Sequence, residues 1–129
     1  MPHPLISLDT SRIHRGRAGD LKAAMEDLAA FVDENEPEAI AYHVYLDESA
    51  SRVSVLQVHP DAASMEFHMR VAASAFPRFS ELLTLSSIDI YGEPSGELLA
   101  EMRRKARMLG DAPLQVHRLH AGFSRLATR

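Results

Sequence analysis

The stretch RVSVLQVHPDAASMEFHM, residues 52–69, contains the signals that decide the fold. Its first eight residues are rich in β-branched side chains, which favours a β-strand. Asp61 follows directly after a proline, and its side-chain oxygen is suited to cap the N-terminus of a helix. Met65 and Met69 then recur on one helical face, with His68 at its margin. The stretch therefore predicts a strand, a tight turn and a helix that runs to about residue 75.

Three segments that precede this stretch extend the pattern. Residues 5–13 mix apolar and polar positions, which predicts a strand buried partly on both faces. Residues 18–36 carry an apolar stripe with three- and four-residue spacing, which predicts a helix, and Pro37 ends it. Residues 39–46 are rich in β-branched and aromatic side chains. We expect them to form an antiparallel hairpin with residues 52–59.

The segments that follow add one more strand to the sheet and then an extension. Residues 76–83 are expected to form a short broken helix, and residues 86–91 alternate again and supply the fourth strand. Residues 95–109 have the apolar spacing of a helix that ends near Gly110. Residues 114–126 suggest a late extended segment.

The order strand, helix, hairpin, helix, strand is that of a ferredoxin-like unit. We therefore predict the α+β class, with an antiparallel four-stranded sheet, helices on one face, and an extra C-terminal helix and strand. With 129 residues, 46% of them hydrophobic, the chain fits one compact unit. Residues 1–94 are expected to form its core, and residues 95–129 to pack on the same domain or on a dimer partner.

Composition excludes several classes of function. The chain has no cysteine, which excludes disulfides, thiolate metal ligands and a cysteine nucleophile. Its formal charge is −4 and charges of both signs are interspersed, so we expect no nucleic-acid partner. The basic cluster at residues 103–107, which includes Lys105, is interpreted as a solvated helix face. No apolar run suits a membrane span and the first residues do not resemble a secretion signal, so we expect a cytoplasmic protein without a membrane partner.

Residues 58–69 resemble the strand-to-helix connection of antibiotic biosynthesis monooxygenase-like proteins, in which a histidine commonly occupies the place of His68. Residues 36–45 and 90–94 resemble two further strand segments of that group, so the resemblance spans about residues 4–94. It implies a homodimer in which two sheets pack face to face as a dimeric α+β barrel. The side chains expected to form the hidden apolar face are Val44, Leu46, Val53, Val55 and Ile88.

The chain departs from that group at residues tied to specific activities. Quinone-forming members are associated with Trp, Asn and Arg or Tyr, and haem-degrading members with Asn, Trp and His. This chain has no Trp, and Asn35 is its only Asn. The resemblance therefore implies a monooxygenase-like protein that acts on or binds a small aromatic or polyketide-like molecule, with neither metal nor cofactor. The alternative is a noncatalytic dimeric module that binds a ligand or assists another protein.

Histidine can remove a proton near neutral pH without a cofactor, and the resulting carbanion can react with oxygen. We predict His68, His43 and His59 as catalytic residues. The predicted substrate-binding residues are Tyr45, Gln57, Phe67, Phe76 and Phe79. These side chains are expected around a pocket between sheet and helices. The alternative is that each His is an ordinary hydrogen-bonding residue and that the tyrosines are core packing.

Other polar residues are interpreted more simply. The seven histidines have no spacing that favours a metal site, so no metal is expected. Asp9 and Asp89 lie on the first and fourth strands, where they are interpreted as exposed strand ends and not as a carboxylate pair.

Overall fold

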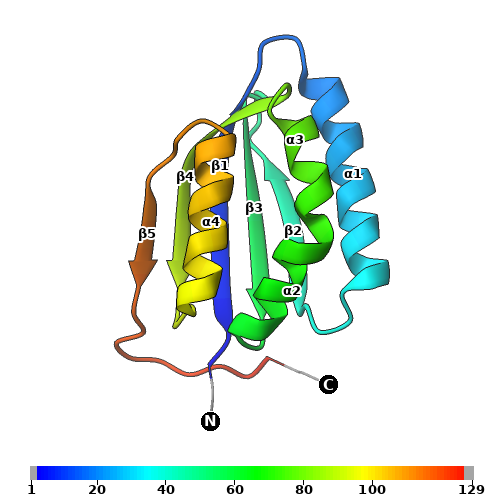
Figure 1. Ribbon diagram of the computed structural model, residues 1–129. Helices are drawn as coiled ribbons and strands as arrows, with labels where there is room; N and C mark the ends of the chain where they lie inside the picture. The colour runs from blue at the N-terminus through cyan, green and yellow to red at the C-terminus, as the bar shows by residue number, and fades with distance from the viewer. Residues whose placement is uncertain (1–2, 127–129) are drawn as a thin grey trace.

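The computed structural model describes residues 3–126, which form a five-stranded mixed sheet with the helices on one face (Figure 1). The strands are β1 (Leu5–Ile13), β2 (Ala41–Leu46), β3 (Arg52–His59), β4 (Leu83–Tyr91) and β5 (Leu114–His117). The helices are α1 (Ala18–Asn35), α2 (Ala62–Ala72), the 3-10 turn η1 (Ala73–Ala75), α3 (Phe76–Phe79) and α4 (Gly96–Met108). The predicted α+β class is confirmed.

The strand order is β2-β3-β1-β4-β5. Strand β1 pairs antiparallel with β3 and β4, and β2 pairs antiparallel with β3, which confirms the predicted ferredoxin-like sheet. Strand β5 runs parallel to β4, because α4 carries the chain back along the sheet between them. The predicted late extended segment is a strand only at Leu114–His117, and residues 118–126 have no regular secondary structure.

The helix-covered face of the sheet contains the apolar side chains that were predicted for the opposite face. Val53, Val55 and Ile88 are buried in the core. Val44 pairs with Val55 and Leu46 with Val53, so these two side chains share that face. The prediction was wrong because successive side chains alternate between the two faces, and these residues belong to the set that the helices cover.

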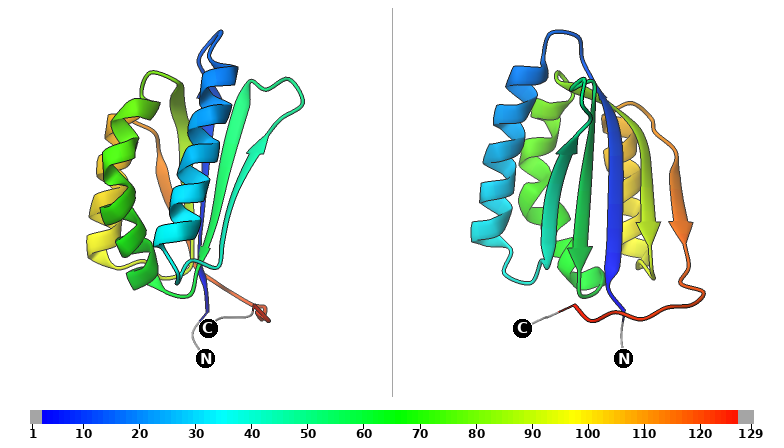
Figure 2. Two further views of the ribbon diagram at one scale, coloured as in Figure 1. Left: turned by 90° about the vertical axis from the view of Figure 1, so that its right-hand side faces the viewer. Right: turned by 180° about the vertical axis from the view of Figure 1, so that it is seen from behind.

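The uncovered face of the sheet has a different apolar centre. Ile6 and Leu8 of β1 lie beside Val58 and Leu56 of β3, and all four side chains are half-buried. Seen from behind in Figure 2, this face has no helix over it. Strands β1 and β3 therefore leave an apolar surface in the middle of the sheet.

Local signals fix the helix ends. Asp61 accepts a hydrogen bond from the backbone N–H of Ser64 at 2.9 Å, and Ser95 accepts one from Leu98 at 3.0 Å. Such caps stabilise a helix by about 1 kcal/mol each. Gly110 follows α4 with φ of +130°, a conformation that side-chain-bearing residues rarely adopt. Within residues 3–126, each helix is too short or too polar to cross a bilayer.

Candidate functional site

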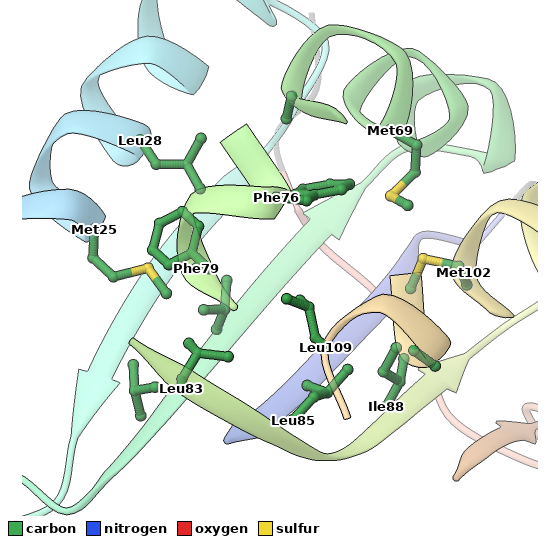
Figure 3. Packing of buried hydrophobic residues seen from close by; sticks show 14 of the residues in the cluster. Met25, Leu28, Met69, Phe76, Phe79, Leu83, Leu85, Ile88, Met102 and Leu109 are labelled. Carbon is green, nitrogen blue, oxygen red and sulfur yellow. The ribbon is translucent and has the colours of Figure 1, made fainter. Parts of the chain in front are cut away.

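A small cavity of about 40 Å³ lies between the helix layer and the covered face of the sheet. Its apolar lining residues are Met25, Leu28, Val53, Val55, Phe76, Phe79, Leu83, Leu85 and Leu109. Figure 3 shows Met25 and Leu28 of α1 close to Phe79, with Leu85 and Leu109 across the core. A polar group inside such a wall interacts strongly with its neighbours, because little water screens it.

Polar side chains reach this cavity from both layers. Asp9 and Ser11 come from β1, Tyr42 from β2, His68 from α2 and Lys105 from α4. Residues far apart in the sequence thus meet at one place in the core.

His68 is held by Glu36. Its Nδ1 lies 2.9 Å from Oε1 and 2.8 Å from Oε2 of Glu36, and both side chains are almost completely buried. A carboxylate only accepts hydrogen bonds, so Nδ1 carries the proton and Nε2 of the neutral ring keeps a lone pair. Nε2 makes no hydrogen bond within residues 3–126. The pair therefore has the arrangement of an oriented general base.

Asp9 and Lys105 form a second buried pair. Nζ of Lys105 donates to Oδ2 of Asp9 at 2.5 Å, and the two side chains are 9% and 6% exposed. Oδ1 of Asp9 is buried and has no hydrogen-bond partner among the described residues. Nζ also lies 5.1 Å from the ring centre of Phe76, within the range of a cation–π contact. The ammonium group of Lys105 and the carboxylate of Asp9 thus lie together beside the cavity.

Tyr42 lies between these two pairs. Its ring centre is 5.7 Å from that of His68. Burial raises the pKa of the Tyr42 hydroxyl, and the negative charges of Asp9 and Glu36 raise it further. The hydroxyl therefore stays protonated at physiological pH and can donate a hydrogen bond to an oxygen that becomes negative.

His59 supports the site from one side. Its ring centre is 6.0 Å from that of His68. Nδ1 lies 2.7 Å from Oγ of Ser64 and Nε2 lies 3.0 Å from Oε1 of Gln57. Burial, and then the nearby His68, lower the pKa of His59 to about 4. His59 is therefore neutral near pH 7, and its Nε2–H donates to Gln57 while Nδ1 accepts from Ser64.

The structure brings together part of the predicted site. His68, Phe76 and Phe79 line the cavity. His59 and Gln57 are buried on the same face of the sheet and hydrogen-bond to each other. They do not line the cavity itself.

Three other predicted residues lie elsewhere. His43 and Tyr45 are exposed on the uncovered face, where Nδ1 of His43 lies 3.0 Å from the Tyr45 hydroxyl. Their predicted place in the pocket was wrong, because Val44 between them faces the helices and alternation turns its neighbours away. Phe67 is 39% exposed on α2, with the Arg70 guanidinium over its ring, so it does not line the cavity either. Its position on the helix faces away from the stripe that α2 buries.

Sequence interpretation missed Lys105 because the neighbouring arginines suggested a solvated face. Leu98, Met102, Lys105 and Leu109 are all buried, at the spacing of one helical stripe. That spacing was the available signal, and the solvated interpretation is wrong for Lys105. Glu36 carried a similar signal, since it lies four residues after the buried Val32.

Asp9 was missed for a related reason. It alternates with Leu5 and Ile13 on the buried face of β1 and is 5% exposed, so it is not an exposed strand end. Asp89 faces the opposite side of the sheet, where Oδ1 lies 2.9 Å from Nε2 of His117. The two carboxylates do not form a pair.

No family model and no curated protein matches the chain. Solved structures do match its fold. MupZ from Pseudomonas fluorescens aligns with a TM-score of 0.73 and 16% identity, over 95% of each chain. A putative antibiotic biosynthesis monooxygenase from Deinococcus radiodurans aligns with a TM-score of 0.60 and 20% identity, over 71% of this chain and 94% of that one. A second protein so described, from Bacteroides thetaiotaomicron, has a TM-score of 0.53 and 18% identity, over 64% and 85% of the two chains.

The coverages differ between these structures. An alignment over 95% of this chain must include most of α4 and β5, whereas the two putative monooxygenases align with only about two thirds of it. The chain therefore shares its fold with structures described as putative antibiotic biosynthesis monooxygenases, and α4 and β5 follow the four-stranded ferredoxin-like unit in its sequence.

Proposed function

We propose that the protein binds a small aromatic or polyketide-like molecule in the cavity between sheet and helices and removes a proton from it with His68. The observation that carries this proposal is the Glu36–His68 pair, whose unpaired Nε2 belongs to a side chain that lines the cavity. Glu36 stabilises the imidazolium that forms, as a carboxylate does for a catalytic histidine elsewhere. Tyr42 donates to the oxygen on which negative charge develops.

A monooxygenase reaction extends this step. Loss of a proton from an activated methylene group gives a carbanion, and dioxygen is the second substrate that accepts its electrons. Conversion of the methylene group to a ketone then consumes one dioxygen molecule and releases one water molecule, so no other reductant is required. The shared fold with putative antibiotic biosynthesis monooxygenases favours this reaction class. None of these steps uses His43, Tyr45 or Phe67.

Dioxygen uptake with a panel of hydroxylated aromatic compounds tests the proposal. His68→Ala is expected to lower the rate by about 10²- to 10⁴-fold, the usual contribution of a general base. His120→Ala is the matched control, because His120 is exposed in the C-terminal segment. A folded His68→Ala protein with unchanged uptake would remove His68 from the mechanism.

One observation favours the alternative of a noncatalytic binding module. A cavity of about 40 Å³ is smaller than the roughly 150 Å³ apolar cavity that accommodates benzene, so Phe76 and Phe79 must move before a ring can enter. A binder without turnover would show saturable ligand binding and no dioxygen uptake with any compound of the panel.

We also propose that the uncovered face of the sheet packs against a second copy of the chain. The apolar centre formed by Ile6, Leu8, Leu56 and Val58 supports this dimer, because monomeric proteins rarely expose such a surface. Light scattering is expected to give twice the chain mass of 14.3 kDa for the wild type and the single chain mass for Leu56→Asp. A wild-type protein of single mass would contradict the proposed dimer.

A further inference from the structure

We infer that Asp9 is a second recognition group in the cavity and that it selects ligands with a hydroxyl or another hydrogen-bond donor. This inference rests on the function proposed above. It concerns the side of the cavity formed by β1 and α4, whereas the proposed base stands on α2.

The two oxygens of Asp9 are treated differently by the protein. Oδ2 accepts the hydrogen bond from Lys105, and Oδ1 accepts none from the described residues although Asp9 is only 5% exposed. A buried polar atom without a partner is unfavourable and rare, so an ion pair that only stabilised the fold would be expected to satisfy both oxygens. The free oxygen indicates a partner that the protein itself does not provide.

The surroundings of Asp9 define the chemistry of that partner. Oδ2 is occupied by the ammonium group of Lys105, and the oxygens of an ion-paired carboxylate accept hydrogen bonds, so Oδ1 requires a donor. The cavity volume of about 40 Å³ exceeds the roughly 10–15 Å³ that a water-sized group needs, so a hydroxyl fits beside Asp9 as the structure stands, whereas a ring that carries it enters only when Phe76 and Phe79 move. A ligand carboxylate would meet the negative charges of Asp9 and Glu36. The class that fits is a neutral molecule with an apolar body and one hydroxyl, such as a phenol or an enol.

A hydrogen bond from a hydroxyl to a charged carboxylate is about twice as strong as one between neutral groups. We therefore expect wild-type protein to bind phenol at least about tenfold more tightly than fluorobenzene, which has nearly the same shape and no donor. Ligand-detected NMR titration measures both dissociation constants. The same ratio is measured in His68→Ala, and in Asp9→Leu combined with Lys105→Met, which replaces the ion pair by apolar groups of similar size.

The double variant is expected to bind both compounds equally, and His68→Ala is expected to keep the preference for phenol. Because the double variant alters the core, its melting curve is compared with that of the wild type. If it fails to fold, Asp9→Asn replaces it and must reduce the preference by at least about threefold, since the charge is lost but the shape is kept.

Equal binding of both compounds by the wild type overturns the role of Asp9 and leaves binding in the cavity intact. If the preference for phenol is lost in His68→Ala but retained in the variant that lacks the Asp9 carboxylate, the hydroxyl binds to His68. That result also overturns the inference. Absence of binding by either compound overturns the proposed function itself.

Discussion

Replacement of Lys105 by methionine is expected to destabilise the fold far more than the loss of a surface lysine. Methionine keeps the length of the side chain and removes its charge, so Asp9 is left as a carboxylate in a site where it is 5% exposed. Removal of one partner from a buried ion pair costs about 3–5 kcal/mol. Typical domains have a total stability of about 5–15 kcal/mol, so the variant would lose about a fifth of it or more. For a chain of this size the melting temperature should fall by about 10–20 °C.

Urea unfolding followed by far-ultraviolet circular dichroism measures this effect, because the chain has no Trp to report by fluorescence. Protein concentration is held constant, since dimerisation would change the apparent stability. Arg104→Met is the matched control: Arg104 is 58% exposed on the same helix, and its ion pair with Glu101 should contribute less than about 1 kcal/mol. Asp9→Leu with Lys105→Met should recover most of the loss, because apolar groups can replace a buried pair. A Lys105→Met variant no less stable than Arg104→Met would refute the reasoning.

Three further predictions concern residues around the site. Burial lowers the pKa of His59 from its ordinary value of 6.5 to about 4, so between these pH values the unfolded chain binds a proton that the folded chain does not. Stability should therefore fall by about 3 kcal/mol as the pH drops from 6.5 to 4, and this dependence should shrink in His59→Gln when urea unfolding is repeated across that range. Gly110→Ala should lower the free energy of unfolding by about 1–3 kcal/mol in the same assay, because φ is +130° and a methyl group would lie 2.7 Å from Cγ2 of Thr84. The control is Gly96→Ala, which should lower it little, because a methyl group there meets nothing within 4 Å. Phe79→Ala should lower stability by about 3–5 kcal/mol and enlarge the cavity, so a ring-sized apolar ligand should raise the melting temperature of this variant more than that of the wild type. Equal shifts would show that Phe79 does not limit entry of the ligand into the cavity.

The elements of this fold could be predicted because each carries a local signal. The stripe of α1, the Asp61 cap and the alternation of β1 are all properties of neighbouring residues. The register between two strands, in contrast, cannot be read from the sequence of one strand alone. Which face of β2 meets the helices depends on its pairing with β3, and a shift of one residue exchanges Tyr42 with His43 at the site. The prediction of Tyr45 as a substrate-binding residue was wrong for this reason, because Tyr42 and not Tyr45 faces the cavity.

Pairs that join distant segments were beyond sequence reasoning for another reason. Asp9 and Lys105 are separated by 96 residues, and Glu36 and His68 by 32. Each charged residue alone resembles a surface residue, because burial of a charge is costly without a partner. Only the tertiary structure identifies the partner. Polar residues at positions where the periodicity demands an apolar one, such as Lys105, are the signal that remains in the sequence.

Helix α4 does more than cover one end of the sheet, because it also provides the cation that pairs with Asp9. Asp9 belongs to β1, the central strand of the core, but the cation that balances it is on α4. A chain that ended after β4 would leave this carboxylate in the sheet without its ammonium partner, at a cost that favours an apolar residue there. The charged side of the cavity thus depends on the extension that the alignment with MupZ includes. Since Lys105 also occupies one oxygen of Asp9 and leaves the other free, the same helix that completes the fold affects which ligand groups the cavity can accept.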